Sequence, residues 1–343
     1  MKKRLLLVMA IISVVALVLV ACESSKKPGE TETSGAAGKK WNIGLSIQGA
    51  NNDWATASYA HFKYALEAYK DQTGNVYFAE CGYDPQKQLA DIEDLLTKNI
   101  DALLVQPVSE TALASVVEKA HEQGVKVIVY GGAIGTDVYD GYMDRDHKAT
   151  GSKYAEYVCE RLGGKGNVVV IMGYPGSGYS NAVLAGVDEV LAKYPNIKSL
   201  GVEYAEYTPA MSKQILEGYF AKGDSVDGVI CDGGLMGFGV LEAFSDANKA
   251  IPPMSCDDTY LFLNKAVELE FSDYICCSSA QELSYDAIEL LFNVLNDKPC
   301  EKENHLPPQV LTGEDALTKI DPATPNNYWY FSKIPAERLD DFF

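Results

Sequence analysis

The chain has 343 residues, of which 47% are hydrophobic and 22% are charged. This composition is typical of a globular body with a large core, and it excludes a mostly disordered chain and a polytopic membrane protein. The 48 acidic residues outnumber the 29 basic ones, so the formal net charge is −19. Such a surface repels nucleic acid and anionic lipid headgroups, and neither is expected as a partner.

The N-terminus has the layout of an export signal followed by a linker. Residues 1–21 place three basic residues before a long apolar run, as in a secretory signal peptide. The sequence LVAC at residues 19–22 resembles the lipobox of bacterial lipoproteins, which implies lipidation of Cys22. An uncleaved membrane anchor is the alternative, because the apolar run is near the shortest length that spans a bilayer. Residues 22–40 are expected to form a flexible tether.

Eight cysteines are present, and seven remain after Cys22. An odd number without paired spacing suggests thiols buried as small hydrophobes, rather than a disulfide framework or a zinc site. The adjacent Cys276 and Cys277 would point to opposite faces of a strand, so no bridge is expected between them. The four histidines fall in separate segments without metal-ligand spacing. We therefore expect no metal and no cofactor.

From Trp41 the chain alternates short β-rich runs with longer helical patterns. The β-rich runs of the first series are WNIGLSIQ, NVYFAE, DALLVQP and VKVIVYGG. Helical patterns separate them, over about residues 54–69, from Asp84-Pro85 to Lys98, and as far as Gln123. Aspartate before proline favours a helix start, because the carboxylate caps free N–H groups and proline fits the first turn. This order predicts a parallel sheet covered on both faces.

A second series begins near Gly166 and repeats the same order. Its β-rich runs are GNVVVIMG, IKSLGVEYAEY, VDGVICDGG, PMSCDD and DYICCSSAQ. Helical patterns are expected at 180–193, 209–221 and 235–248. The predicted fold class is therefore α/β, with two doubly wound, Rossmann-like lobes built on parallel sheets. Ligands of such sheets bind beyond the carboxyl ends of the strands, where this chain has polar and aromatic loops.

In order and spacing, several segments resemble the type I periplasmic binding proteins, the ribose- and galactose-binding branch that delivers sugars to ABC transporters. The segments are IGLSIQGANNDW, DPQKQLADIEDLLTKNIDALLVQP, GVKVIVYGG, GGKGNVVVIMGYPGSG, VDGVICDGGLMGFGVLEAF and SSAQELSYDAIELL. The resemblance runs from about residue 41 to residue 312, although no single motif carries it. It implies two lobes joined by a three-strand hinge that closes on a ligand.

The resemblance also implies where the chain crosses between the lobes. The crossings would lie at Asp144-Arg145-Asp146, near Gln281, and near His305-Leu306-Pro307. The N-terminal lobe would comprise residues 41–144 plus 282–305, and the C-terminal lobe residues 145–281 plus 306–343. The expected hinge residues are Asp144, Arg145, Asp146 and Gln281.

The candidates for contact with a ligand are Gln48, Asn52, Trp54, Asn181, Tyr207, Asp232, Asp257 and Gln281. The resemblance implies that Asn52 bonds sugar hydroxyls and that Trp54 packs on the apolar face of a sugar ring. It also implies that Tyr207 adds an aromatic from the other lobe, that Asp257 accepts from adjacent hydroxyls, and that Gln281 reaches the ligand from the hinge. Two simpler alternatives stay open. Trp54 could pack on its own lobe, and Asp257 could cap a helix that begins near Thr259.

The chain departs from the family pattern at several of these positions. It has Gly131-Gly132 where many relatives have Asp-Arg or Asp-Gln, Asn181 in place of an arginine, and Gly233 in place of an asparagine. These changes remove the fork that would grip vicinal hydroxyls or an anion. Further acidic residues near the cleft are Asp53 and Asp258. We therefore expect a neutral or mildly cationic ligand, and weak binding of phosphorylated or carboxylated sugars.

The loop GYPGSG at residues 173–178 lacks both the Lys-Ser/Thr ending of a phosphate loop and the spacing of a dinucleotide-binding motif. No base–nucleophile pair is visible, so no catalytic residue is assigned. The resemblance implies a monomeric extracytoplasmic lipoprotein, anchored to the cell membrane through Cys22, that captures a small neutral carbohydrate for an ABC permease and its ATPase. The alternatives are a binding protein for a nucleoside or other non-sugar, and a sensory receptor with a signalling partner.

Overall fold

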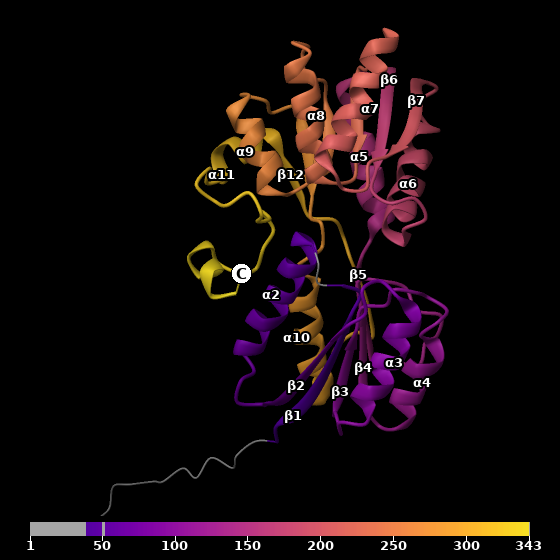
Figure 1. The fold of residues 1–343 in the computed structure, drawn as a ribbon, viewed down its shortest axis with the longest axis vertical. Helices are drawn as coiled ribbons and strands as arrows, with labels where there is room; N and C mark the ends of the chain where they lie inside the picture. The colour runs from indigo at the N-terminus through magenta and orange to yellow at the C-terminus, as the bar shows by residue number, and fades with distance from the viewer. Residues whose placement is uncertain (1–38, 50–51, 343) are drawn as a thin grey trace, which may run out of the picture. The chain divides into compact units, whose positions relative to one another are not determined.

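The computed structural model describes residues 39–49 and 52–342. The predicted signal peptide, Cys22 and most of the predicted tether lie outside the described residues. Residues 40–343 form one unit with two six-stranded sheets, each flanked by helices (Figure 1). Within the described part of the chain, no helix is both long enough and apolar enough to cross a membrane.

The first lobe is built on a parallel sheet with the strand order β11-β5-β4-β3-β1-β2. Its strands are β1 (Trp41–Ile47), β2 (Thr73–Glu80), β3 (Ala102–Val105), β4 (Lys126–Tyr130), β5 (Gly141–Arg145) and β11 (Glu303–Leu306). Its helices are α2 (Asp53–Glu67), α3 (Pro85–Leu96), α4 (Ala114–Glu122) and α10 (Leu283–Leu295). Helix α10 packs on α2 and on β3, β4 and β5, so this late segment belongs to the first lobe.

The second lobe is built on a sheet with the order β12-β10-β9-β8-β6-β7. Its strands are β6 (Lys165–Met172), β7 (Asn196–Tyr204), β8 (Gly228–Cys231), β9 (Met254–Asp257), β10 (Tyr274–Cys277) and β12 (Val310–Thr312). Its helices are α5 (His147–Arg161), α6 (Gly178–Leu191), α7 (Pro209–Lys222), α8 (Gly234–Asp246), α9 (Tyr260–Glu268) and α11 (Gly313–Lys319). The two doubly wound lobes are confirmed, and β12 is the one antiparallel strand of this sheet.

Apolar side chains cover both faces of each sheet. On β3 the neighbours Leu103 and Leu104 are fully buried in two different apolar clusters, as expected for alternate residues of a strand covered on both faces. On β10, Cys276 and Cys277 likewise enter different clusters, which confirms that they point to opposite faces. Burial on both faces explains why the strands read as continuous apolar runs.

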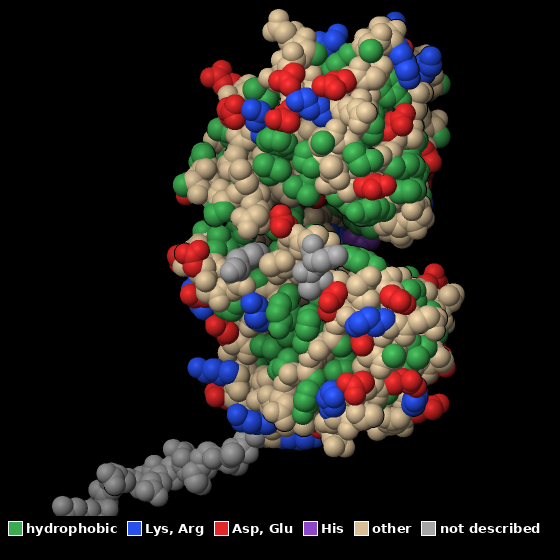
Figure 2. Space-filling model, viewed as in Figure 1, with side chains coloured by type: hydrophobic (Ala, Val, Ile, Leu, Met, Phe, Trp, Pro, Cys, Tyr) green, Lys and Arg blue, Asp and Glu red, His purple; other side chains and the backbone are tan. Residues whose placement is uncertain are grey.

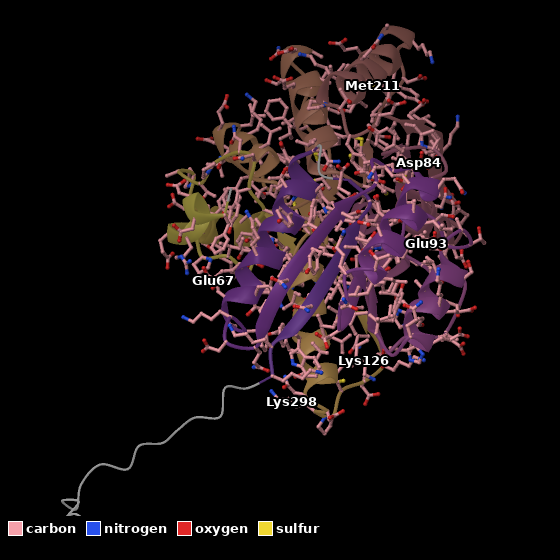
Figure 3. All side chains as sticks on the ribbon, turned by 60° about the horizontal axis from the view of Figure 1, so that its bottom comes forward. Glu67, Asp84, Glu93, Lys126, Met211 and Lys298 are labelled. Atoms are coloured by element: carbon pink, nitrogen blue, oxygen red, sulfur yellow. The ribbon has the colours of Figure 1, made fainter. Side chains whose placement is uncertain are left out.

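The predicted helix start at Asp84 is confirmed. The Asp84 carboxylate accepts from the backbone N–H groups of Gln86 and Lys87, at 2.8 and 3.2 Å, and Pro85 opens α3 (Asp84 is labelled in Figure 3). Asp146, an expected hinge residue, caps α5 in the same way through the N–H of Ala149 at 2.8 Å. These caps satisfy N–H groups that have no partner inside the helix.

Of the seven described cysteines, six are buried and none is in a disulfide. The expectation of buried thiols is therefore confirmed for these six. It is wrong for Cys300, which is exposed in the connection between α10 and β11. The Sγ atoms of Cys256 and Cys276 lie 3.5 Å apart on the neighbouring strands β9 and β10.

The chain passes between the two sheets three times. It leaves the first sheet after Arg145 at the end of β5, returns through residues 278–282 between β10 and α10, and crosses again between β11 and β12. The first and third crossings run side by side, because Leu306 pairs with Arg145 in the sheet. Gln281 lies in the second crossing.

The C-terminal segment, residues 321–342, differs from the expected assignment of residues 306–343 to one lobe. Its first part lies on the second lobe, where the N–H of Phe331 donates to the Asp258 carboxylate at 2.8 Å. Its last part lies on the first lobe, where the N–H of Lys333 donates to Nε2 of His61 at 3.1 Å. Lys63 also donates to the carbonyl of Phe342, at 2.8 Å. Polar groups on α2 thus hold the end of the chain.

Candidate ligand-binding site

The candidate site consists of loops at the carboxyl ends of strands in both lobes. In the first lobe these loops follow β1 and β2, and in the second lobe they follow β6, β7, β8 and β9. Figure 2 shows a recess in the surface between the two lobes. Doubly wound sheets bind their ligands at this edge, so the recess is the candidate site.

Trp54 lies in the first turn of α2 and is half-buried. Its indole N–H donates to the backbone carbonyl of Ser279 at 2.9 Å, in the crossing between β10 and α10. The indole is therefore held at its nitrogen by the hinge and does not form part of the first-lobe apolar cluster around α2. Contact between this ring and a ligand stays a prediction.

Asn52 caps α2 and is exposed. Its Oδ1 accepts from the N–H of Ala55 at 2.8 Å, and its Nδ2 donates to the hydroxyl of Tyr83 at 3.0 Å. Gln48 is engaged in a similar way, because its Nε2 donates to the carbonyl of Pro107 at 2.6 Å. Both amides thus fix neighbouring loops of the first lobe, and a ligand would have to share them.

Tyr207, in the second lobe, has a left-handed backbone with a φ of 54°. Its hydroxyl lies 3.4 Å from Oγ of Ser180, which in turn donates to Oδ2 of Asp232 at 3.0 Å. The other oxygen of Asp232, Oδ1, has no hydrogen-bond partner among the described residues. Two of the predicted residues, Tyr207 and Asp232, are therefore linked through a serine that was not predicted.

Two carboxyl groups of the second lobe have raised pKa values. Burial raises the pKa of Asp232 to about 7, and the nearby Gly173 N–H and Ser180 hydroxyl offset only part of this effect. Burial also raises the pKa of Asp257 to about 7, against the N–H groups of Gly234 and Thr259. A carboxyl group whose pKa lies near neutral pH keeps its proton in part of the molecules, and the protonated form can donate as well as accept hydrogen bonds.

Oδ1 of Asp257 accepts from the N–H of Thr259 at 3.2 Å, but Thr259 is the N-cap residue of α9, so Asp257 lies two residues before the cap and does not cap the helix itself. The side chain keeps part of its surface exposed, so this contact does not exclude a ligand. Asn181 is exposed in the first turn of α6, and no hydrogen bond of its side chain competes with a ligand there within the described structure. Both residues stay candidates.

Gly131 and Gly132 follow β4 and bring the backbone close to neighbouring loops. Gly131 has a φ of 60°, a conformation that suits glycine, and a Cβ on Gly132 would lie 3.0 Å from the carbonyl oxygen of Pro107. A larger side chain at Gly132 would require movement of the Pro107 loop.

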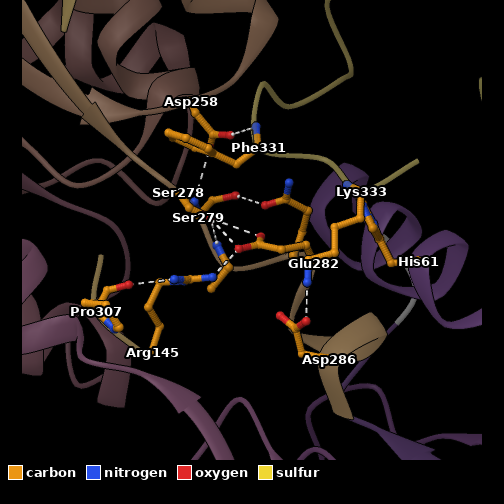
Figure 4. Close-up of polar contacts among 12 residues, drawn as sticks. His61, Arg145, Asp258, Ser278, Ser279, Glu282, Asp286, Pro307, Phe331 and Lys333 are labelled. Atoms are coloured by element: carbon orange, nitrogen blue, oxygen red, sulfur yellow. Dashed lines mark hydrogen bonds and ion pairs between the residues drawn. The ribbon is translucent and has the colours of Figure 1, made fainter. Parts of the chain in front are cut away.

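The hinge holds a buried ion pair (Figure 4). The guanidinium of Arg145 bonds to the Glu282 carboxylate, and it donates to the carbonyl of Pro307 at 2.7 Å. Glu282 also accepts from the hydroxyl of Ser278, at 2.9 Å. The charge of Arg145 is compensated within the crossings and is not offered to an anionic ligand.

Gln281 and Asp258 tie the second crossing to its surroundings. Gln281 is fully buried; its Oε1 accepts from Ser279 Oγ at 2.6 Å, while its Nε2 has no partner among the described residues. Asp258 accepts from the N–H groups of Ser279 and Phe331, at 3.0 and 2.8 Å. Burial raises the pKa of Asp258 well above its ordinary value. Gln281 thus has an unused, buried donor in the second crossing.

Several residues that shape the site were not predicted, namely Tyr83, Ser180 and Glu282 as partners of predicted ones. Asp258, one position after the end of β9, was expected near the cleft, whereas Ser180 lies inside α6, eight positions after the end of β6, and its place in the sequence does not show which partner it selects. In the described ranges, 39–49 and 52–342, no group of His, Cys, Asp and Glu side chains could hold a metal ion.

Comparison with known proteins gives the family. The model described as "Periplasmic binding protein domain" matches residues 43–299. The chain belongs to the periplasmic binding protein family. This periplasmic binding protein is 24% identical over 246 residues to the ribose import binding protein RbsB of Bacillus subtilis, a match that covers 71% of this chain and 78% of that one.

Two further similarities place it within the family. It is 31% identical over 173 residues to the xylitol-binding protein of Mycolicibacterium smegmatis, and this match covers 50% of the chain and only 49% of that relative. A crystal structure of an ABC transporter solute-binding protein from Thermobispora bispora has a TM-score of 0.74 and 26% identity, with coverage of 84% of this chain and 90% of that one. The predicted family and fold are thus confirmed.

Proposed function

We propose that this protein is an extracytoplasmic receptor that binds a small neutral sugar or polyol between its lobes and delivers it to an ABC permease with its ATPase. The proposal is supported by Trp54, which the hinge holds through the Ser279 carbonyl, and by Tyr207, Asp232 and Asp257 at strand ends of the second lobe. An aromatic ring desolvates the C–H face of a sugar, and carboxyl groups bond its hydroxyls. The relatives named for ribose and xylitol support this choice.

The neutral character of the ligand follows from the charges around the site. Arg145 is paired with Glu282, whereas Asp232 and Asp257 lie at the ends of neighbouring strands. An anionic ligand would meet carboxyl groups and a cation that is already compensated. Binding drives lobe closure only as far as the ligand prefers the closed state.

Isothermal titration calorimetry with D-ribose, D-xylose, D-allose and xylitol tests the proposal, with ribose 5-phosphate as the anionic comparator. We expect at least one neutral compound to bind and to raise the melting temperature by mass action. The phosphate ester should bind far more weakly than ribose. A preference for the phosphate ester, or no response to any neutral compound, would contradict the proposal.

A nucleoside or another flat non-sugar is the second candidate. Gly131 and Gly132 offer no side-chain group that could grip the vicinal hydroxyls of a sugar, and this favours a ligand with fewer hydroxyls. Adenosine and uridine in the same titration separate the two candidates. A nucleoside that binds more tightly than all four neutral polyols would favour the second.

We further propose that Cys22 carries the lipid that holds the protein at the membrane. One acyl chain binds a membrane only marginally, whereas several chains hold it stably. The prediction is that the full-length protein fractionates with membranes and that Cys22→Ser releases it. Membrane retention of the Cys22→Ser protein would instead favour an uncleaved anchor.

A further inference from the structure

Tyr207 has a backbone conformation that needs an explanation. Both Glu206 and Tyr207 adopt positive φ angles, 49° and 54°, immediately after β7. Residues with a Cβ avoid this region, and two in a row are held there only when the surrounding structure fixes them. Strain of this kind gathers at ligand sites and clamps. The strained turn fixes the position of the Tyr207 side chain.

Two glycines make room for the ring. Gly173 follows β6 and Gly233 follows β8, and these strands are neighbours in the sheet, with Ile171 opposite Cys231. A Cβ on Gly173 would lie 2.1 Å from Cζ of Tyr207, and a Cβ on Gly233 would lie 2.9 Å from its Cδ1. Both distances are shorter than real Cβ contacts. The ring therefore rests directly on two adjacent strand ends.

The backbone of these glycines does not by itself demand glycine. Neither Gly173 nor Gly233 is among the glycines with positive φ, and Gly233 has an extended conformation with φ of −148° and ψ of 136°. Other residues adopt such angles freely. The absence of a Cβ at both positions is thus explained by contact with Tyr207.

The edges of the ring are held as well. Its hydroxyl lies 3.4 Å from Oγ of Ser180, which is fixed by Asp232. Tyr174 packs edge-on against it, with ring centroids 5.7 Å apart and planes at 65°. Tyr207 is only partly buried, so part of its surface remains open to contact.

We propose that Gly173 and Gly233 form a slot that seats the ring of Tyr207, and that the seated ring is the wall by which the second lobe selects its ligand. This inference rests on the proposed function. A ring seated this deeply leaves more space for a ligand than a ring displaced by the methyl group of an alanine at Gly173 or Gly233. The seated ring presents its carbon atoms to the ligand. The selected compounds are those that turn a C–H-rich face toward the second lobe, whereas a lifted ring would exclude the larger of them.

Single methyl groups test the slot. Gly233→Ala and Gly173→Ala are compared with Gly178→Ala, a control in the first turn of α6 where no heavy atom lies within 4 Å of the added Cβ. Calorimetry with D-ribose, D-xylose, D-allose and xylitol gives the affinity of each variant. We expect at least one slot variant to lose tenfold or more for the best wild-type ligand and to change the order of preference, while Gly178→Ala stays within twofold.

Removal of the ring shows whether the methyl acts through it. The double variant Gly233→Ala/Tyr207→Ala should bind as Tyr207→Ala does, because no ring is left to displace. Its melting temperature should match that of Tyr207→Ala, whereas Gly233→Ala alone should melt below the wild type. This comparison keeps the test valid if Gly173→Ala fails to fold.

The outcomes separate this inference from the function on which it rests. If the wild type binds none of the four compounds, the proposed function fails and the inference fails with it. If the wild type binds and the slot variants keep both its affinity and its order of preference, only the inference is overturned. Losses in the double variant that are the sum of the two single losses would also overturn it, because the methyl would then act independently of Tyr207.

Discussion

The carboxylate of Glu282 is paired with the guanidinium of Arg145, and the exposed fractions of these side chains are 0% and 3%. The two residues lie in different crossings between the lobes, and Arg145 also bonds the third crossing through Pro307. This buried pair and the bond to Pro307 thus link all three crossings between the lobes.

Loss of this pair should destabilise the protein strongly. Glu282→Gln leaves the Arg145 charge buried without compensation, which costs about 3–5 kcal/mol for pairs of this kind. We expect a clear fall in the free energy of unfolding measured in urea. Glu189→Gln is the control, because Glu189 pairs with Lys148 at the exposed surface, where a pair contributes only about 0–1 kcal/mol. Equal effects of the two substitutions would contradict the hinge role.

Trp54 should contribute to binding through its ring and to stability through its nitrogen. Trp54→Phe keeps an aromatic face but removes the N–H that bonds Ser279, so it should lower stability by about 0.5–1.5 kcal/mol and retain most of the affinity. Trp54→Ala should lose at least tenfold in affinity for the best sugar of the panel, measured by calorimetry. A Trp54→Ala protein that binds as tightly as the wild type would remove this residue from the site.

The raised pKa of Asp232 predicts a pH dependence of stability. Below the ordinary value of 3.8 the group is protonated in both the folded and the unfolded chain. Between pH 3.8 and the folded pKa of about 7, the carboxyl group of Asp232 is ionised in the unfolded chain but still protonated in the folded one, so the stability of the fold decreases as pH rises. The slope approaches about 1.4 kcal/mol for each pH unit in that window. Above it the effect is constant.

Asp232→Asn should remove this slope, since an amide mimics the protonated carboxyl and can still accept from Ser180. The melting temperatures of the wild type and the variant are measured at pH 5 and pH 8. Relative to the wild type, Asp232→Asn should be more stable at pH 8 than at pH 5. Asp71→Asn, on the exposed surface, is the matched control. The same pH difference in wild type and Asp232→Asn would show that this carboxyl ionises normally.

Ending the chain after Phe331 should destabilise both lobes. The truncation removes the N–H of Lys333 from Nε2 of His61 in the first lobe, and it withdraws Ile334 and Leu339 from the apolar cluster of the second lobe, which Ala60 of α2 also joins. We expect a lower melting temperature, with Arg338→Ala, a change in an exposed ion pair with Glu67, as the mild comparison. A truncated protein that melts with the wild type would show that these contacts carry no stability.

The two-lobed fold could be predicted because its strands are buried on both faces and therefore read as apolar runs between helical patterns. The C-terminal segment could not, because it is mostly irregular and its partners are far away in the sequence; Lys63 and Phe342 are an example. The positions of Tyr207 and Asp232 at strand ends were predictable. Their link through Ser180, and the left-handed turn at Tyr207, depend on packing that no sequence spacing encodes.

The C-terminal segment also affects how the protein reaches its native state. A chain is synthesised from its N-terminus, and domains generally fold as units while it emerges. Here His61 and Asp258 bond to Lys333 and Phe331, which lie far downstream of both residues in the sequence. Each lobe can therefore gain its contact with this segment only after residues 331–333 have been synthesised.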